Sequence, residues 1–260
     1  MILDMNKVPW LTRLEISQET NHLLDRWSAF IGQKVKPPIP VEAIAENYLG
    51  IAVEYDNLEE MLGISDVLGA TWVESKTMVI NSSLLDGAEG RISFTCSHEI
   101  GHWVLHRKYF FEHFSRKDPS GVDPSPTVVC RISTSKLRGE WQADYFGACL
   151  LMPSSEVQEA FEGVFGKEPL ALYNKKSCFG CRNSIVLDPA LDTVKEIAGR
   201  VIDRGDFTNV SRESMGYRLH ELGLLKNFTG EALPSYFKQA YHFYSSQQAK
   251  KELGKTEEIV

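Results

Sequence analysis

The segment from Gly90 to Tyr109 has the sequence GRISFTCSHEIGHWVLHRKY. It contains no proline and its apolar residues recur with a helical period, so the whole segment is expected to form one helix. His98 and His102 are then on one face of this helix, about 6 Å apart along its axis. This spacing lets two imidazoles bind a single tetrahedral cation.

The His-Glu-x-x-His string of residues 98–102 also indicates a metal and a chemistry. Zinc accepts nitrogen and carboxylate ligands, and a catalytic zinc site uses three protein ligands and leaves the fourth position for water. Glu99 would lie beside that water as a general base. We therefore predict one zinc ion per chain, with Glu99 as the catalytic residue in the hydrolysis of peptide bonds.

The third zinc ligand must come from another segment, because His106 lies about 12 Å from His98 along the helix axis. Glu140 is the preferred candidate, since it begins a second predicted helix that ends before Pro153. Asp144 follows one turn later, where it can accept the outer N–H of a ligating histidine. The alternative third ligands all follow the first helix: Glu112, His113, Asp123 and Cys130.

A small sheet is expected ahead of the zinc helix. Residues 51–55 read as one strand, and residues 69–73 and 77–80 read as a hairpin. Residues 12–32 have a helical pattern, and the proline-containing stretch 115–139 is typical of a long surface segment. The predicted fold class is therefore α+β, mostly helical, with a small antiparallel sheet.

The C-terminal part is predicted to be helical. Residues 167–189 read as irregular, and two helices follow in an arrangement similar to a helix-turn-helix. The second of them offers Arg212 and Arg218 against two glutamates, which disfavours DNA contact. We expect one domain over residues 1–166, a helical, helix-turn-helix-like region over 167–245, and a flexible tail over 246–260.

The composition is that of a globular protein, with 260 residues, 43% of them hydrophobic and 24% charged. No apolar run approaches the roughly 20 residues that span a bilayer, and the first residues lack a secretory pattern. Five cysteines without regular spacing suit reduced thiols, so a cytoplasmic protein is expected, with Cys178 and Cys181 as a structural pair. A net charge of −7 favours protein or peptide partners over nucleic acid and membrane.

Two motifs resemble those of a known family, the ImmA/IrrE metallo-endopeptidases. Residues 91–106, RISFTCSHEIGHWVLH, are similar to its zinc helix, and residues 140–153, EWQADYFGACLLMP, are similar to its glutamate helix. The resemblance covers residues 37–165 and, more weakly, 209–224. Two features depart from the family pattern: the 37 residues between His102 and Glu140 are more than is typical, and cysteines stand at positions 96 and 149.

The resemblance implies a zincin-like fold and a gluzincin-like site in which His98, His102 and Glu140 bind zinc. It also implies a substrate, a helix-turn-helix repressor whose cleavage releases stress-response or mobile-element genes. A donor to the developing oxyanion is needed as well, and the candidates are Tyr109, Tyr145 and His106. The alternative hypothesis is a metal-dependent transcriptional regulator that binds protein or DNA without proteolysis.

Overall fold

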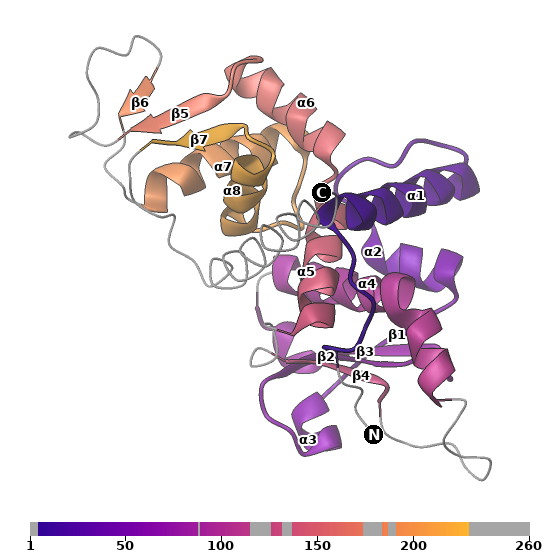
Figure 1. Ribbon diagram of the computed structural model, residues 1–260. Helices are drawn as coiled ribbons and strands as arrows, with labels where there is room; N and C mark the ends of the chain where they lie inside the picture. Colours follow the sequence, from indigo (N-terminus) through magenta and orange to yellow (C-terminus); the bar gives the residue numbers. More distant parts are fainter. Residues whose placement is uncertain are drawn as a thin grey trace, which may run out of the picture.

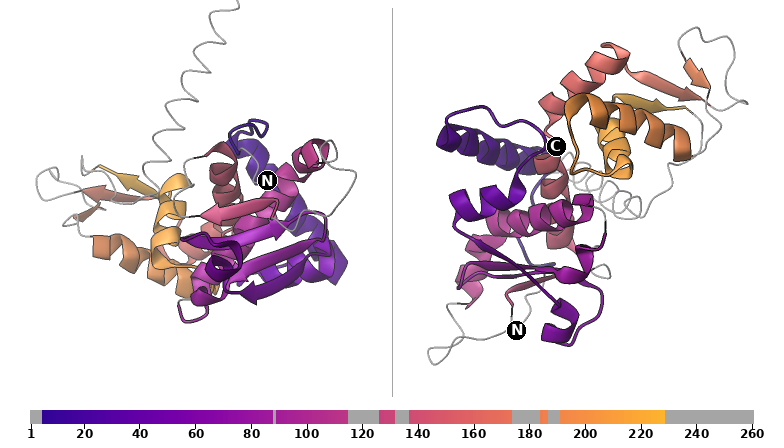
Figure 2. Two further views of the ribbon diagram at one scale, coloured as in Figure 1. Left: turned by 90° about the horizontal axis from the view of Figure 1, so that it is seen from below. Right: turned by 180° about the vertical axis from the view of Figure 1, so that it is seen from behind.

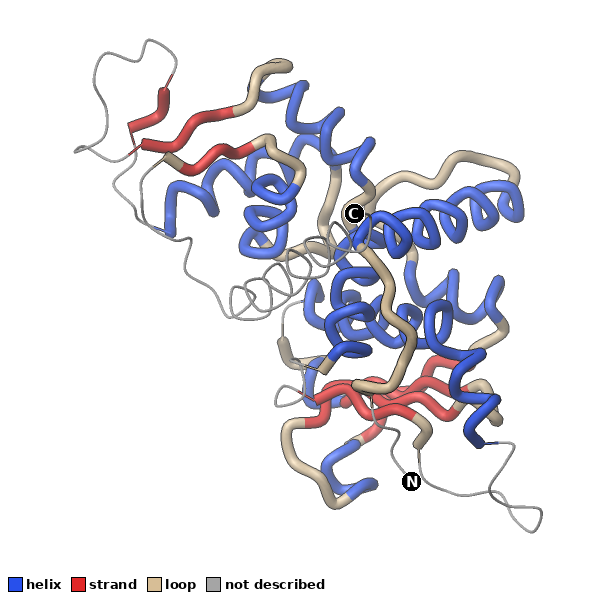
Figure 3. Tube along the Cα trace, viewed as in Figure 1, coloured by secondary structure: helices blue, strands red, loops and turns tan. Residues whose placement is uncertain are grey.

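The structure of this chain is a computed structural model that describes residues 5–87, 89–114, 126–131, 137–173, 184–186 and 191–228. Helices predominate over strands, and the strands form two separate sheets (Figure 3). The predicted α+β, mostly helical fold class is confirmed. Asp123, Cys178, Cys181 and the predicted tail at 246–260 lie outside the described residues, as does the side chain of His113.

The first sheet has the strand order β1-β3-β2-β4, with β1 at Ala52–Asp56, β2 at Val67–Trp72, β3 at Thr77–Asn81 and β4 at Val128–Arg131. Strands β2 and β3 form the predicted antiparallel hairpin, and β4 adds to β2 in antiparallel orientation. Strand β1 pairs with β3 in parallel, so the small sheet that was expected to be antiparallel is mixed. A short helix, α3 (Leu58–Leu62), separates β1 from β2, and this longer connection lets β1 reach the far side of the hairpin.

The helices cover both faces of this sheet (Figure 1). Helix α4 (Glu89–Phe114) packs on one face, with α5 (Arg138–Leu151) packed against α4, and α3 packs on the other face over a small apolar cluster that includes Leu58, Ala70 and Val129. The predicted helix at residues 12–32 forms α1 (Arg13–Ile31), which begins with a capping box between Thr12 and Glu15. A short helical segment, α2 (Val41–Ala43) and η1 (Ile44–Leu49), completes this layer, and η2 (Ser82–Leu84) follows β3.

The C-terminal part is not only helical. Helices α6 (Ser154–Phe165), α7 (Leu191–Gly205) and α8 (Arg212–Glu221) accompany a second sheet of three parallel strands, with order β6-β5-β7. Figure 2 shows this sheet set apart from the first one. Strands β5 (Leu170–Tyr173) and β6 (Ser184–Val186) lie where the sequence predicted irregular structure. The prediction missed them because each strand is short and β5 pairs with the distant β7 (Leu225–Asn227).

One continuous apolar core joins the two parts of the chain. It contains side chains from α4 and α5, such as Ile100 and Phe146, together with Leu172 of β5 and Leu225 of β7. Helices α6 and α7 lie side by side and extend this core. Among the helices that the structure describes, none has the length and apolar character needed to cross a bilayer.

The close packing of α4 against α5 depends on glycines at the contact. A Cβ placed on Gly101 would lie 3.0 Å from the Cα of Ala143 and 3.1 Å from its carbonyl oxygen, and a Cβ on Gly147 would lie 2.9 Å from the Ser97 hydroxyl. Larger residues at these positions would push the two helix backbones apart. The glycines therefore set the distance between the helix that carries the two histidines and the helix that carries Glu140.

We expect Gly101→Ala to weaken metal binding, since the added methyl group meets backbone atoms of α5 that cannot rotate away. Overpacking of this kind costs about 1–3 kcal/mol of folding free energy. Gly163→Ala is the matched control, because the atoms nearest to its Cβ would belong to the exposed Arg204 side chain, which can move away. Thermal unfolding and metal titration of both variants test this expectation, and equal metal affinity in the two would contradict it.

Candidate metal centre

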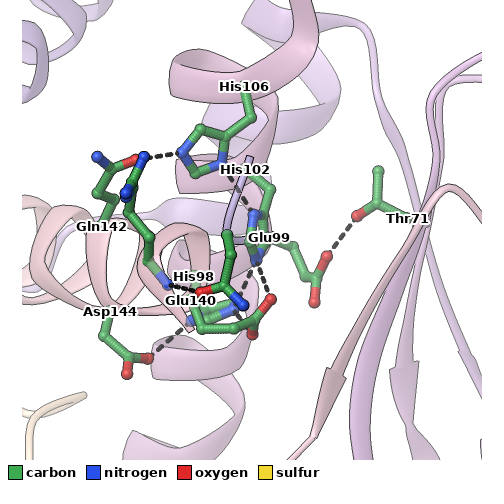
Figure 4. Close-up of polar contacts among 10 residues, drawn as sticks. Thr71, His98, Glu99, His102, His106, Glu140, Gln142 and Asp144 are labelled. Atoms are coloured by element: carbon green, nitrogen blue, oxygen red, sulfur yellow. Dashed lines mark hydrogen bonds and ion pairs between the residues drawn. The ribbon is translucent and has the colours of Figure 1, made fainter. Parts of the chain in front are cut away.

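Three buried side chains from α4 and α5 form a group that could hold a metal ion: His98, His102 and Glu140. Their ligand atoms all lie within 4.8 Å of one another. The two Nε2 atoms are 2.9 Å apart, and the Glu140 carboxylate oxygens lie 3.4 Å from His98 Nε2 and 3.5 Å from His102 Nε2 (Figure 4). The structure thus brings together the three residues predicted as ligands.

The tautomer of His98 is set by Asp144, one helical turn after Glu140. The distance from His98 Nδ1 to Asp144 Oδ1 is 2.8 Å. An ionised carboxylate only accepts, so the Nδ1–H of His98 donates this hydrogen bond. When the ring is neutral, its one proton is therefore on Nδ1, and Nε2 carries a lone pair that points toward Glu140 and His102, which is the arrangement expected of a ligating histidine and its carboxylate partner.

The tautomer of His102 is set by a chain of hydrogen bonds that begins in the N-terminal segment. Gln142 Nε2 donates to the carbonyl oxygen of Pro9 at 3.0 Å, so its Oε1 faces His106 and accepts from His106 Nε2 at 2.8 Å. Burial, followed by the neighbouring His102, lowers the pKa of His106 to about 3, so the His106 ring is neutral. Its Nδ1 therefore accepts from His102 Nδ1, at 3.1 Å, and leaves a lone pair on His102 Nε2.

The resulting donor set fits a divalent cation. Two imidazole lone pairs and a carboxylate converge on one point where His98 is 2% exposed and His102 is fully buried. Burial alone would lower the pKa of His98, but the adjacent Cys130, Asp144 and Glu140 side chains raise it well above its ordinary value. Burial opposes ionisation of Glu140, yet the two histidines lower its pKa to about 2. The group therefore attracts positive charge, and nitrogen and carboxylate ligands in this number suit zinc.

Glu99 lies next to this group and accepts a hydrogen bond from a residue of the first sheet. The Thr71 hydroxyl of β2 donates to Glu99 Oε2 at 2.5 Å (Figure 4). The other oxygen, Oε1, is buried and has no hydrogen-bond partner among the residues that the structure describes. Burial is the main cause that raises the pKa of Glu99, partly offset by the two nearby histidines. A carboxylate with a raised pKa and one open oxygen is suited to take a proton from a molecule bound at the centre.

The three candidates for the oxyanion donor lie elsewhere or are already engaged. Both ring nitrogens of His106 are used in the chain behind His102, so it acts on the tautomer of His102 instead. The Tyr145 hydroxyl hydrogen bonds with Glu221 and Ser17, away from the metal group. Tyr109 lies about 16 Å from His98 along the axis of α4. None of these contacts assigns an oxyanion donor.

Two alternatives to Glu140 as the third ligand, Glu112 and Cys130, differ in their distance from the histidines. Glu112 is exposed near the end of α4, well away from the histidines. Cys130 of β4 is different, because it forms a second group with His98 and Glu99 whose ligand atoms lie within 4.8 Å of one another. The preferred ligand, Glu140, is therefore in place, and Cys130 is an additional neighbour of the site.

Sequence reasoning missed Gln142, Pro9 and Thr71. Gln142 lies on α5 two residues after Glu140, but its role depends on a carbonyl group more than 100 residues earlier in the chain. Thr71 lies in a predicted strand, on the face of the sheet that contacts Glu99. No local pattern marks either contact.

Comparison of the chain with protein-family models gives no match, and neither does comparison with curated proteins.

Metal affinity is expected to rise with pH across the neutral range. The raised pKa of His98 means that its Nε2 holds a proton in the metal-free protein, and a cation must displace that proton. For each proton released on binding, the metal affinity rises about tenfold when the pH rises by one unit. Competition with a chelating dye at several pH values measures the slope, and a flat profile between pH 6 and pH 8 would exclude this protonation scheme.

Replacing Gln142 with methionine should weaken metal binding by about 10–100-fold, the usual effect of losing a partner that orients a ligand. Without the amide oxygen, His106 can carry its proton on Nδ1, and the proton of His102 is then driven to the metal-binding Nε2. Gln158→Met on the exposed face of α6 serves as the control. The scheme fails if folded Gln142→Met protein binds metal as tightly as the control.

Proposed function

We propose that this protein is a zinc-dependent endopeptidase. The observation that supports this most strongly is the combination of a buried His98, His102 and Glu140 group with Glu99, whose nearby Oε1 atom is buried and has no hydrogen-bond partner in the described part of the chain. A purely structural metal site has no need for a fourth acidic side chain with an open oxygen beside it. A hydrolytic site does, because an attacking water must lose a proton.

Each residue has a distinct part in the proposed reaction. Zinc at this site would supply Lewis acidity, which acidifies water and polarises the scissile carbonyl. Glu99 takes the proton from the attacking water through Oε1 and later gives it to the leaving amine. Thr71 holds the other oxygen of Glu99, so the carboxylate keeps its orientation while its charge changes. Asp144 and His106 hold the outer ring nitrogens of His98 and His102, so that both Nε2 atoms face the position of the metal.

The proposed substrate is a helix-turn-helix repressor, and its cleavage would release stress-response or mobile-element genes. The support is the similarity of residues 91–106 and 140–153 to the two ImmA/IrrE signatures. The helices that carry these two motifs, α4 and α5, pack against each other. A repressor substrate would place the reaction in the cytoplasm.

The alternative is a metal-dependent regulator that acts on protein or DNA by binding alone. For the DNA version, the arginines of α8 would have to face the duplex. Arg218 is only 5% exposed; its Nε donates to the carbonyl oxygen of Met152 and its Nη1 pairs with Glu221. It is therefore engaged inside the protein, which counts against DNA contact through this helix.

Glu99→Gln separates catalysis from binding. The amide keeps the size of the side chain but cannot act as a base, so we expect retained zinc and a loss of peptide hydrolysis by about 10²–10⁴-fold. The assay incubates the zinc-loaded protein with a purified helix-turn-helix repressor of the same organism and follows the products by intact mass.

The exposed Glu159 of α6 provides the control, since Glu159→Gln makes the same chemical change far from the centre. Wild-type protein and this control should cut the repressor at the same bond. If Glu99→Gln matched them in activity, the endopeptidase proposal would be refuted and the binding-only regulator would be preferred.

A further inference from the structure

Strand β4 carries one thiol toward the metal group. Cys130 is paired with Gly69 in the antiparallel ladder, and Val128 is paired with Thr71. Paired residues point to the same face of a sheet, and Thr71 points to Glu99, so Cys130 points to α4 as well. The intervening pair, Ala70 and Val129, packs into the cluster on the opposite face, as strand alternation requires.

The residue opposite Cys130 leaves space for this approach. A Cβ on Gly69 would lie 2.8 Å from Glu99 Oε1 and 2.9 Å from the Thr95 methyl group. Because Gly69 has no side chain, the Glu99 carboxylate can lie against β2 at this point. Cys130 and Glu99 Oε1 therefore lie on the same side of the sheet, between the sheet and α4.

The thiol lies within ligand distance of the same histidine that serves the metal group. The Cys130 sulfur, a nitrogen of His98 and an oxygen of Glu99 lie within 4.8 Å of one another, and the Cys130 thiol hydrogen bonds with His98. All three residues are at least nine-tenths buried. His98 thus belongs to two candidate ligand groups, one completed by His102 and Glu140 and the other by Glu99 and Cys130.

We propose that Cys130 is a fourth protein ligand of the metal, so that the resting site is a closed set of His98, His102, Glu140 and Cys130. When the cation binds, the thiol S–H bond breaks, its proton passes to solvent, and the thiolate sulfur binds the metal. The Cys130 side chain must then move toward His102 and Glu140 as the ligands draw together. Two imidazoles, one carboxylate and one thiolate suit a tetrahedral zinc ion.

This inference rests in part on the proposed function and gives it a regulatory consequence. Hydrolysis needs the fourth position for water, and a thiolate there excludes it. The closed site is also consistent with the burial of all four side chains. The resting protein would therefore be latent, and a movement of β4 that withdraws Cys130 would open the metal to water next to Glu99.

Cobalt(II) provides a direct readout of the sulfur ligand. Full-length protein loaded with one cobalt ion per chain should show an intense thiolate-to-cobalt charge-transfer band in the near ultraviolet. We expect Cys130→Ser to lose this band while keeping the weaker cobalt bands of the remaining ligands. Wild-type protein without the charge-transfer band would overturn the ligand assignment, whatever the activity of the protein.

Two controls identify the sulfur. Cys149→Ser makes the same change at another buried cysteine, on α5 beside Ser17, and should keep the band. A Cys178→Ser, Cys181→Ser double variant should keep it too, which excludes a thiolate pair elsewhere in the chain. Thermal unfolding shows whether Cys130→Ser is folded. If this variant does not fold, the spectra of the wild-type protein and of the two controls still test the assignment. Loss of the band in either control would overturn the assignment to Cys130.

Zinc-loaded variants then test the latency. Cys130→Ser should cut the repressor at least about tenfold faster than wild-type protein. Equal rates in two active proteins would overturn the latency. If the cobalt band depends on Cys130 but neither protein cuts the repressor, the endopeptidase proposal fails while the fourth-ligand assignment stands.

Discussion

Two imidazole lone pairs that face each other across 2.9 Å repel unless positive charge lies between them. Here both rings are buried, and each has its other nitrogen committed to a fixed acceptor, Asp144 for His98 and His106 for His102. The rings therefore cannot relieve the repulsion by exchanging tautomers. A carboxylate completes the arrangement from the second helix, and a cation that satisfies all three groups makes the packing of α4 on α5 favourable.

The rest of the first part of the fold serves this arrangement. Glycines at the α4 and α5 contact allow the two backbones to approach closely enough for side chains of both to reach one point. The sheet adds a second direction of approach, because Thr71 of β2 and Cys130 of β4 come to α4 from the opposite side. Glu99 lies between these two layers. Its position gives it contact with the metal group on one side and with a polar strand residue on the other.

The sequence was sufficient to predict those parts of the site that depend on local periodicity. The spacing of His98 and His102, the helix begun near Glu140 and the one-turn separation of Asp144 all follow from helical geometry, and the structure places these side chains together. Contacts between distant segments could not be predicted in this way. The parallel pairing of β1 with β3, the second sheet, the Gln142 contact with Pro9 and the approach of Cys130 each depend on where the chain returns in space.

The N-terminal segment before α1 supports the candidate metal centre, although the candidate ligands lie on α4 and α5. Backbone carbonyls of Met5 and Val8 accept hydrogen bonds from Gly139 and Arg138 at the start of α5, and that of Pro9 orients Gln142. A fragment cut to begin at the first helix would keep every ligand and still lose these anchors. The smallest unit that preserves the histidine tautomers therefore starts upstream of the first regular element, and domain boundaries drawn from helices and strands alone would exclude it.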